Sequence, residues 1–418
     1  MIDIQYIKNN VEKVKKAALN KNRKADIDGI LKLDEKRREL IKEAQNLREK
    51  RNEISKQNPP TKEIIEEGKK IKESLKNIEN NLTTVETELK NLMLYVPNVP
   101  LDEVPVGSDE TGNIEIKKWG ETPKFDFQIK DHIELATSLD LVDFERGNKV
   151  SGFRGYFLKN EGAVLHMALL FYVFQKLIKK GYTPVIAPSI IKGFTLFGSG
   201  HFPWGSEQDV YKLNEDDMFL SGTAEIPITA MYSGEILNEK DLPKKFVGFS
   251  PCFRKEAGTY GKDTKGLYRL HEFWKIEQVI LGENNLDKAR SIHEELQKNS
   301  EEILQDLNLP YRQLLMCTGD MGEPQLKKYD IETYMPSRNG YGETMSNSIM
   351  GDFQARRLNI KYKTKEGKTD FVYTFNNTAV ASPRILIAII ENYQQEDGSI
   401  KIPEVLQSLT GFKEIKRN

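Results

Sequence analysis

The segment Cys252–Glu277 reads CFRKEAGTYGKDTKGLYRLHEFWKIE and places charged side chains of both signs around three glycines. Before the glycines, alternate residues put Arg254 and Glu256 on one side of an extended chain and Phe249 and Phe253 on the other. After them, the same alternation separates a polar set, Arg269, His271, Phe273, Lys275 and Glu277, from an apolar set, Leu270, Trp274, Ile276 and Ile280. Two such strands predict an antiparallel hairpin whose charged faces lie on the same side of a sheet.

The charged face of this hairpin has two interpretations. It is either a solvated sheet face or a platform for a ligand. Phe273 favours the platform, because an aromatic ring among charges can stack on a planar ligand.

The composition of the 418-residue chain limits its function. With 62 basic and 63 acidic residues the net charge is -1, so no bulk positive field attracts nucleic acid and any RNA contact must be local. Two cysteines, Cys252 and Cys317, exclude a disulfide framework and a cysteine-rich zinc site, and they fit a reducing cytoplasm. None of the five histidines stands in a zinc-ligand pattern.

No segment predicts membrane insertion or export. The first residues lack a continuous apolar run, and the longest apolar stretch, AVLHMALLFYVF at 163–174, is too short to span a bilayer. We therefore expect a cytoplasmic protein with no membrane partner.

Residues from about 27 to 95 are rich in Lys, Glu, Leu and Ile and are interrupted by a Pro-Pro tip at about 56–62. In the second half, apolar residues follow coiled-coil spacing at Ile64, Ile71, Leu75, Ile78, Leu82, Val85, Leu89 and Leu92. In the first half, leucine and isoleucine recur every seven residues at Leu33, Leu40, Leu47 and Ile54. The pattern predicts a helical hairpin about 45 Å long that buries only a thin apolar stripe. A charged coiled coil that spaces or dimerises something is the simplest interpretation.

The proline-containing stretch VPNVPLDEVPVG at 96–107 predicts a linker. We therefore expect a helical arm domain over 1–107 and a second domain over 108–418. In the second domain short strands alternate with helices without a βαβ rhythm, which favours an α+β fold with an antiparallel sheet flanked by helices.

A series of segments resembles the class II seryl-tRNA synthetases, in the order typical of that family. The resemblance covers nearly the whole chain, and the ordered set is specific although each segment alone is weak. GYTPVIAPSI (181–190) resembles the first class II motif, the hairpin the second and ASPRILIAII (381–390) the third. The remaining matching segments are the arm, WGETPKFDFQIKDHIEL (119–135), DFERGNKVSG (143–152), SGTAEIPIT (221–229), LLMCTGDMG (314–322), GDFQARR (351–357) and ENYQQEDGSIKIPEVL (391–406).

The resemblance implies an ATP-dependent ligase that joins L-serine to AMP, releases pyrophosphate, and transfers the seryl group to the 3′ end of tRNA(Ser). A carboxylate is already a nucleophile, so the first step needs positioning and charge neutralisation at the α-phosphate rather than a general base. Arg254 matches the arginine that bridges the serine carboxylate and this phosphate, Glu256 the acceptor for the adenine amino group, and Phe273 the ring under adenine. For Arg254 and Glu256 the alternative is a surface ion pair, worth under about 1 kcal/mol.

The resemblance also implies three sets of site residues. The ATP-binding set is Arg254, Lys255, Glu256, Arg269, Leu270, Phe273, Glu343, Thr344, Met345, Ser346 and Arg384. The serine-binding set is Thr223, Ala224, Glu225, Arg254, Glu277, Asn376 and Thr378, and the catalytic set is Arg254, Glu277 and Arg384. Glu343 and Ser346 match the Mg2+ ligands, and oxygen donors suit that ion, although polar residues at the end of a strand are the alternative.

Arg384 carries a physical argument of its own. ASPRILIAII predicts a buried helix with Ser382 at the N-cap and Pro383 at the first position. Arginine in the first turn opposes the helix dipole by roughly 0.3 to 1 kcal/mol, and a bound polyphosphate would remove this conflict. The alternative is an ion pair with a nearby carboxylate.

Four positions depart from the usual family pattern. Ile349 stands where an asparagine is common, Thr378 replaces a serine, and Ala379 and Pro383 replace glycines. Thr378 keeps a hydroxyl for serine recognition, but we expect its methyl group and Ala379 to narrow the pocket.

For the arm, the resemblance implies contact with the long variable stem of a tRNA bound to the other subunit of a homodimer, through backbone and shape. Candidate contacts are Lys50, Arg51, Lys56, Lys69, Lys70 and Lys76. The sequence leaves open whether tRNA(Sec) is also charged.

Two other functions fit parts of the sequence. A ligase that loads a small amino acid onto a carrier protein has the same chemistry, but the arm argues against it. A degenerate fold acting as an RNA-binding or regulatory module would have no need for the full set of Arg254, Glu256, Glu277, Glu343 and Arg384.

Overall fold

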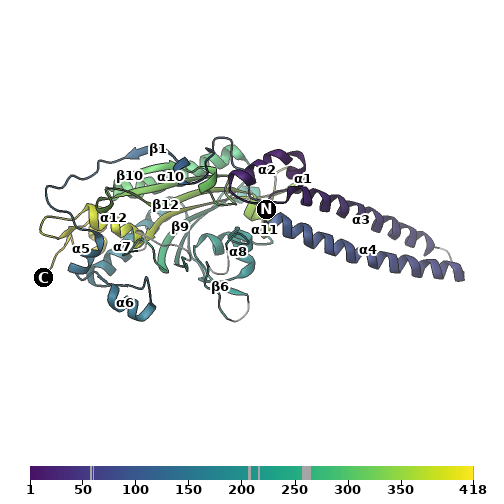
Figure 1. Cartoon of the computed structure of the whole chain (residues 1–418), viewed down its shortest axis with the longest axis horizontal. Coiled ribbons are helices and arrows are strands. Elements are labelled where there is room, and N and C mark those ends of the chain that lie inside the picture. Colours follow the sequence, from purple (N-terminus) through teal and green to yellow (C-terminus); the bar gives the residue numbers. More distant parts are fainter. Residues whose placement is uncertain (57–58, 60, 206–208, 215–216, 257–264, 418) are drawn as a thin grey trace. The chain divides into compact units, whose positions relative to one another are not determined.

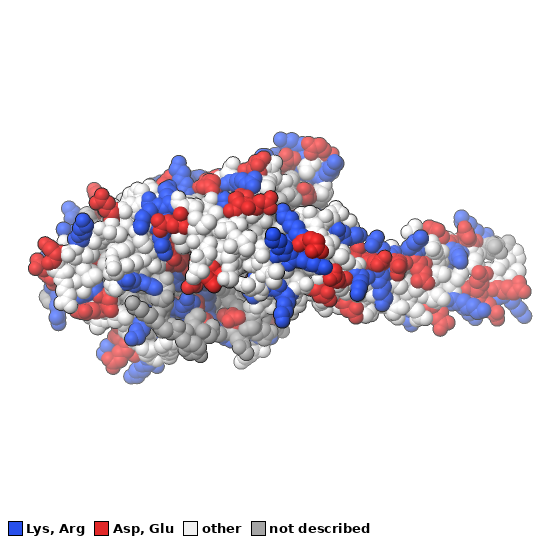
Figure 2. Space-filling view, turned by 45° about the horizontal axis from the view of Figure 1, so that its top comes forward, with Lys and Arg blue, Asp and Glu red and all other residues white. Residues whose placement is uncertain are grey.

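The computed structural model describes all residues except 57–58, 60, 206–208, 215–216, 257–264 and 418. Two compact units make up the chain: unit 1 is Met1–Val99 and unit 2 is Pro100–Asn418. On the face drawn in Figure 2, Lys and Arg alternate with Asp and Glu over both units, in keeping with the balanced composition.

Unit 1 is helical. Its elements are α1 (Ile4–Asn9), α2 (Val11–Asn20), α3 (Ile27–Ile54) and α4 (Lys62–Leu94), and the last two pair as the predicted hairpin (Figure 1). The core of this unit lies at the open end of the hairpin, where Ile7 and Val14 pack against Ile30, Leu89 and neighbouring residues. The two short helices α1 and α2 were not predicted, and they cover this end.

Toward the tip the hairpin buries only a thin stripe, as predicted. Ala44, Leu75 and Ile78 are buried there, and Leu40 and Leu47 pack against them. With 28 and 33 residues, α3 and α4 are about 42 and 50 Å long at 1.5 Å per residue.

Unit 2 is built on an eight-stranded sheet. Its strand order is β1 (Ile114–Trp119), β10 (Tyr311–Leu315), β11 (Lys327–Met335), β12 (Gly340–Gly351), β15 (Tyr373–Ser382), β9 (Glu272–Gly282), β8 (Lys244–Phe253) and β4 (Thr183–Ile186). All neighbouring strands are antiparallel except the edge pair of β4 and β8, which is parallel. The α+β class is confirmed, with this one parallel pair as a departure from the expected antiparallel sheet.

The two faces of the sheet differ because residues alternate along each strand. On one face, Gln278, Asn347 and Asn377 hydrogen bond to residues of α10 (Leu286–Asp306), at 2.7, 2.9 and 2.6 Å. Their sequence neighbours Glu277 and Thr378 point to the other face, where a cavity lies.

Helix α7 (Asn160–Lys179) packs against β8, β9 and β15. It is long and apolar enough to cross a membrane by length and composition, so the expectation that its apolar run is too short is wrong. Leu165, Leu169, Val173 and Leu177 are nevertheless buried in the core of unit 2. The core helix of a soluble protein can be equally long and apolar.

The remaining elements of unit 2 are short and surround the sheet. The helices are η1 (Glu110–Gly112), α5 (His132–Ser138), α6 (Phe144–Ser151), α8 (Gly193–Ser199), α9 (Glu225–Ala230), η2 (Glu239–Asp241), η4 (Thr318–Asp320), η5 (Pro336–Arg338), α11 (Phe353–Leu358), α12 (Arg384–Asn392) and α13 (Glu404–Thr410). The strands are β2 (Val142–Asp143), β3 (Phe157–Leu158), β5 (Ile190–Lys192), β6 (Met218–Leu220), β7 (Ile236–Asn238), β13 (Lys361–Lys363), β14 (Thr369–Phe371), β16 (Ile400–Lys401) and β17 (Glu414–Ile415).

Two local predictions need correction. The hairpin is antiparallel as expected, but its strands end at Phe253 and begin again at Glu272, so Arg254, Glu256, Arg269 and His271 lie beyond the paired strands. Helix α12 begins at Arg384 with Pro383 in the N-cap position, and the predicted N-cap residue Ser382 is instead the last residue of β15.

Candidate active site

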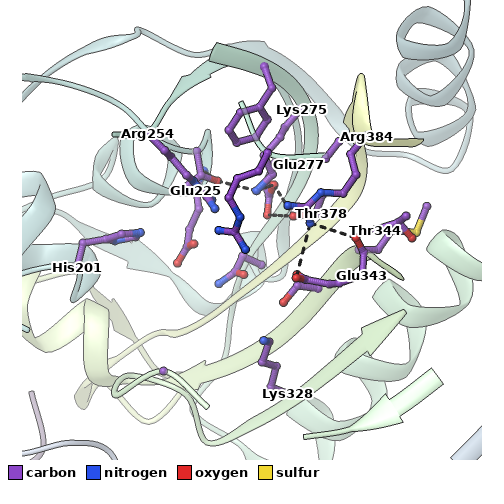
Figure 3. A pocket seen from close by; sticks show the side chains of 18 of the residues that line it. His201, Glu225, Arg254, Lys275, Glu277, Lys328, Glu343, Thr344, Thr378 and Arg384 are labelled. Carbon is purple, nitrogen blue, oxygen red and sulfur yellow. Dashed lines mark hydrogen bonds and ion pairs between the residues drawn. The ribbon is translucent and has the colours of Figure 1, made fainter. Parts of the chain in front are cut away.

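A cavity of about 440 Å³ opens on the face of the sheet away from α10. Figure 3 shows His201 and Glu225 on one side of it and Glu343 and Arg384 on the other. The cavity is lined by Ser199, Gly200, His201, Thr223, Glu225, Arg254, Glu256, Leu267, Tyr268, Arg269, Leu270, Phe273, Lys275, Glu277, Gly322, Glu323, Pro324, Gln325, Lys328, Glu343, Thr344, Met345, Ser346, Met350, Asn376, Thr378, Ala381, Pro383 and Arg384. We call the part around Arg254, Arg269 and Arg384 the arginine side, and the part around Glu225 and Glu277 the carboxylate side.

On the arginine side, Arg254 leaves the end of β8 and turns over the ring of Phe273, with 5.3 Å between the guanidinium carbon and the ring centroid. Its Nε donates to the Gly222 carbonyl at 3.3 Å, and its own carbonyl is 3.0 Å from Nδ1 of His271. His271 therefore supports the Arg254 backbone.

Glu256 pairs with Arg269 across the hairpin, with 2.5 Å between Oε2 and Nη1. The alternative named in the sequence analysis was a surface ion pair between Arg254 and Glu256. Glu256 instead pairs with Arg269, on the other side of the hairpin loop. Glu256 adopts φ +51°, in the left-handed region that side chains rarely occupy, which is where the chain turns after β8. Both members of the pair line the cavity.

Arg384 stands at the first position of α12 and reaches into the arginine side. Its Nε donates to the Tyr268 carbonyl at 3.0 Å, and its Nη1 donates to the Glu343 carbonyl at 3.0 Å. The Glu343 carboxylate is 3.6 Å from the same guanidinium, so the considered ion pair is also present. Arg384 also lies 4.6 Å above the Tyr268 ring.

Glu343 and Ser346 face the same cavity although they are three residues apart. Residues three apart in a regular strand point to opposite faces, but β12 carries a bulge at Thr344, where Met345 pairs with Ile331 and Glu343 with Glu332. Desolvation raises the pKa of Glu343, but the cations of Arg384 and Lys328 outweigh it and leave the pKa below its usual value.

The carboxylate side contains two carboxylates and one ammonium group. Lys275 Nζ lies 2.6 Å from Glu277 Oε2 and 3.1 Å from Thr223 Oγ1, and the Thr378 hydroxyl donates to Glu277 at 3.1 Å. Glu225 is buried and accepts from Gln354 at 2.7 Å. Burial, with the charge of Glu277 as a second cause, raises the pKa of Glu225 to about 7.

Two further groups on this side are poised for a ligand. The buried Nδ2 of Asn376 has no hydrogen-bond partner among the described residues. His201 lies nearby with an exposed side chain, and desolvation by the groups around the cavity, together with the charges of Arg254 and Lys275, lowers its pKa to about 4. His201 is therefore neutral near pH 7 and keeps a lone pair available as an acceptor.

The departures from the family pattern have different consequences from those expected. Ala379 is fully buried in the core of unit 2 and does not line the cavity, so it does not narrow the pocket. It forms a bulge between Thr378 and Val380, which lets both Thr378 and Ala381 face the cavity. Ile349 is also a core residue, whereas Thr378 and Pro383 line the cavity.

Nearly all of the residues assigned to ATP, serine or Mg2+ lie in this one cavity. Lys255 and Ala224 do not line it: Lys255 lies 5.8 Å over the ring of Tyr211, and Ala224 is buried in a small core cluster. The six basic candidates on the arm are all exposed on α3, α4 or the turn after α3. Among the residues that the structure describes, no group of three or more His, Cys, Asp or Glu could hold a metal.

Sequence reasoning missed part of the cavity wall. His201, Tyr268, Gln325 and Lys328 line the cavity but stand outside the predicted sets. Lys275 was predicted only as part of the hairpin's charged face. The alternation along β9 was sufficient to find Lys275, but no local pattern marks the others, because they lie in loops or on β11.

Comparisons with known proteins agree with this geometry. A family model described as seryl-tRNA synthetase N-terminal domain matches residues 1–100, and one described as tRNA synthetase class II core domain (G, H, P, S and T) matches residues 209–393. A serine–tRNA ligase from Symbiobacterium thermophilum is 44% identical over 424 residues, covering 100% of each chain. The chain belongs to the seryl-tRNA synthetase family.

Solved structures from this family have the same fold. The crystal structure of seryl-tRNA synthetase from Pyrococcus horikoshii complexed with ATP has a TM-score of 0.94 and 38% identity and covers 100% of each chain. Cytoplasmic serine-tRNA ligase from Naegleria fowleri in complex with AMP has a TM-score of 0.89 and 32% identity and covers 100% of this chain and 99% of that one. The predicted family and class II fold are therefore confirmed.

Proposed function

We propose that this chain is a serine–tRNA ligase, which activates L-serine with ATP to seryl-adenylate, releases pyrophosphate, and transfers the seryl group to the 3′ end of tRNA(Ser). The observation that carries the proposal is that one cavity joins Arg254, Arg384 and the ring of Phe273 to the carboxylates Glu225 and Glu277. Membership of the seryl-tRNA synthetase family supports the same activity.

ATP is assigned to the arginine side. Phe273 offers a face for adenine, but the Arg254 guanidinium now lies over that ring, so nucleotide binding would move it toward the α-phosphate. Arg269 and Arg384 then neutralise the outer phosphates, and Glu256 accepts from the adenine amino group. Guanidinium groups suit this task because they bind phosphate through two parallel hydrogen bonds.

L-serine is assigned to the carboxylate side. Its ammonium group would lie near Glu225 and Glu277, and its hydroxyl near Thr378, where Glu277 already accepts from the threonine hydroxyl. A pocket that hydrogen bonds this hydroxyl disfavours alanine, because alanine leaves the buried polar groups unpaired. The serine carboxylate then faces Arg254 on the arginine side and attacks the α-phosphate without a general base.

A magnesium ion fits the residues at the edge of the arginine side. Glu343 is about half exposed, with 48% of its side chain accessible, and Ser346 lies beside it in the cavity wall, so both could offer oxygen donors. These two residues would hold the ion with the help of ATP phosphates, and the ion would supply charge neutralisation there.

The protein is assigned to the cytoplasm as a homodimer. Val164, Met167 and Phe171 follow one another at helical spacing on α7, are exposed, and form with Leu409 a shallow apolar surface. Contiguous exposed apolar groups of this kind mark protein interfaces. The exposed basic residues of α3 and α4 would contact the tRNA backbone.

Amino-acid-dependent exchange of labelled pyrophosphate into ATP tests the activity. Serine should support exchange and glycine or alanine should not; exchange with only the latter would favour a carrier-protein ligase, and no exchange would favour a regulatory module. Charging of tRNA(Ser) and tRNA(Sec) transcripts then tests the second step and decides whether both are substrates.

A further inference from the structure

The buried carboxylate of Glu391 connects two sequence segments to which no function has been assigned, 119–135 and 391–406. It is the first residue of the ENYQQEDGSIKIPEVL segment and lies near the end of α12, with no exposed surface. Four donors from two other segments surround it: the backbone N–H and Nδ1 of His132, and the backbone N–H and hydroxyl of Ser337, at 2.8 to 3.0 Å. A buried carboxylate with this many donors is held in one orientation.

His132, in the WGETPKFDFQIKDHIEL segment, connects Glu391 to the cavity wall. Its Nδ1 faces Glu391, and its Nε2 lies 3.2 Å from the backbone nitrogen of Leu267, which lines the cavity. An amide N–H can only donate, so Nε2 must be the unprotonated nitrogen and Nδ1 must carry the proton. The Glu391 carboxylate thereby sets both the tautomer and the direction of the imidazole.

The glycine beside Leu267 shows that this approach is close. Gly266 has φ +64°, and a Cβ atom there would lie 2.2 Å from Nε2 of His132. Any other residue would push the ring away from the Leu267 amide. One of the three glycines in the hairpin segment is thus required by contact with a histidine more than 130 residues earlier in the chain.

The first residue of helix α12 holds the carbonyl of Tyr268, the residue that follows Leu267. Arg384, at its first position, donates to the Tyr268 carbonyl at 3.0 Å and lies 4.6 Å from the Tyr268 ring. Arg338, which follows Ser337, lies at the same distance from that ring. Two neighbouring residues of the cavity wall, Leu267 and Tyr268, are therefore fixed by the two ends of one helix.

We propose that His132 is a positioning residue for ATP: Glu391 orients its imidazole, and the imidazole holds the Leu267 amide and with it the wall formed by Leu267, Tyr268 and Arg269. The inference rests on the proposed assignment of ATP to the arginine side. It predicts that loss of the hydrogen bond from the Leu267 amide to Nε2 weakens ATP binding and leaves the carboxylate side intact.

Two substitutions separate positioning from general packing. In His132→Asn the amide can still donate to Glu391 but is too short to reach Leu267, whereas in His132→Gln the longer side chain can place an oxygen where Nε2 now accepts. In serine-dependent pyrophosphate exchange, His132→Asn should raise KM for ATP by about 5- to 10-fold, as expected for one lost hydrogen bond. KM for serine should stay within about twofold of the wild-type value, and His132→Gln should restore KM for ATP.

The KM values of the two His132 variants decide whether His132 positions the ATP-binding wall. A selective rise in KM for ATP in His132→Asn with recovery in His132→Gln supports the inference, provided that both variants unfold at similar temperatures. An equal rise in both KM values, or no difference between the two variants, overturns it. Arg384→Ala serves as the reference: if it raises KM for ATP while His132→Asn does not, only the role of His132 fails, and if Arg384→Ala also has no effect, the ATP assignment itself fails.

Discussion

Serine binding should release a proton from Glu225. Burial and the nearby Glu277 raise the pKa of this carboxyl group to about 7, from an ordinary value of 4.5, so it is about half protonated in the free protein at pH 7. The ammonium group of serine favours the charged carboxylate. Binding at the carboxylate side should therefore lower the pKa of Glu225 and expel its proton.

The raised pKa of Glu225 makes protein stability and serine affinity change with pH in opposite directions. Folding favours the neutral carboxyl group over the ionised form, so its contribution to stability is fully present below about pH 4.5 and is lost as the pH rises through about 7. Raising the pKa from 4.5 to about 7 corresponds to about 3 kcal/mol. Serine affinity instead rises with pH, because serine binding requires the ionised form of Glu225. Apparent affinity for serine should therefore weaken by about tenfold between about pH 8.5 and about pH 6.

Isothermal titration calorimetry with serine alone tests this reasoning. Without nucleotide, the phosphates of ATP do not titrate, and His201 stays neutral because its pKa is lowered to about 4. Titrations at pH 7 in buffers of different ionisation enthalpy should show release of about half a proton per serine bound.

The matched variant is Glu225→Gln, which keeps the shape and the neutral hydrogen bonding of the protonated acid. It should bind serine more weakly at pH 8, release no proton, and lose the pH dependence between 6 and 8.5. Asp330, whose pKa burial raises to about 6, titrates in both proteins and is cancelled by the comparison. If the wild-type protein releases no proton at pH 7, or if Glu225→Gln keeps the same slope, the assignment of the serine ammonium to Glu225 is refuted.

Substitutions at two positions test other parts of the site, and a shortened arm tests tRNA binding. Arg254→Ala should lower the rate of serine-dependent pyrophosphate exchange by about 100- to 1,000-fold, since it removes a cation from the reacting phosphate. The unfolding temperature of this variant should stay unchanged because the Arg254 side chain is exposed. Normal exchange would show that Arg254 does not act on the phosphate. Thr378→Val should raise KM for serine by about 5- to 10-fold, because the hydroxyl bonded to Glu277 is lost, whereas Thr378→Ser should remain near the wild-type value; equal behaviour of the two would exclude a role for the hydroxyl. Replacing residues 41–80 by a short Gly-Ser turn keeps the buried Asp34 and Leu89 in place, and it should spare exchange but reduce charging of tRNA(Ser) more than about tenfold; full charging would remove the tRNA role of the arm.

Local periodicity in the sequence predicted the elements that carry the site. The alternation along 272–282 correctly separated Phe273, Lys275 and Glu277 from Trp274 and Ile276, because β9 pairs with β8 without a bulge. The coiled-coil spacing likewise predicted α3 and α4, since a helix of this length shows the same face every seven residues. These inferences succeeded because the signal and the structure both depend on neighbours within a few residues.

Local alternation cannot place side chains where the strands are irregular. The bulges at Thr344 and Ala379 reverse the alternation beyond them, so Ser346 joins Glu343 at the cavity and Ala381 joins Thr378 there. A bulge depends on the partner strand, and a single strand carries no reliable sign of it. The expectation that Ala379 narrows the pocket was wrong because this residue points away from its neighbour Thr378, into the core.

The sequence by itself determined the family, the helical arm, the α+β class and most of the residues at the cavity, through ordered segments and local alternation. Only the tertiary structure decided how the cavity is completed. His201 and Lys328 line the cavity, and Glu391 acts on its wall through His132 and Leu267. These residues stand far apart in the chain, and only the packing of helices and strands around the sheet brings them together. The strong pKa shift of Glu225 has the same origin, because burial and the approach of Glu277 exist only once the strands and helices have packed.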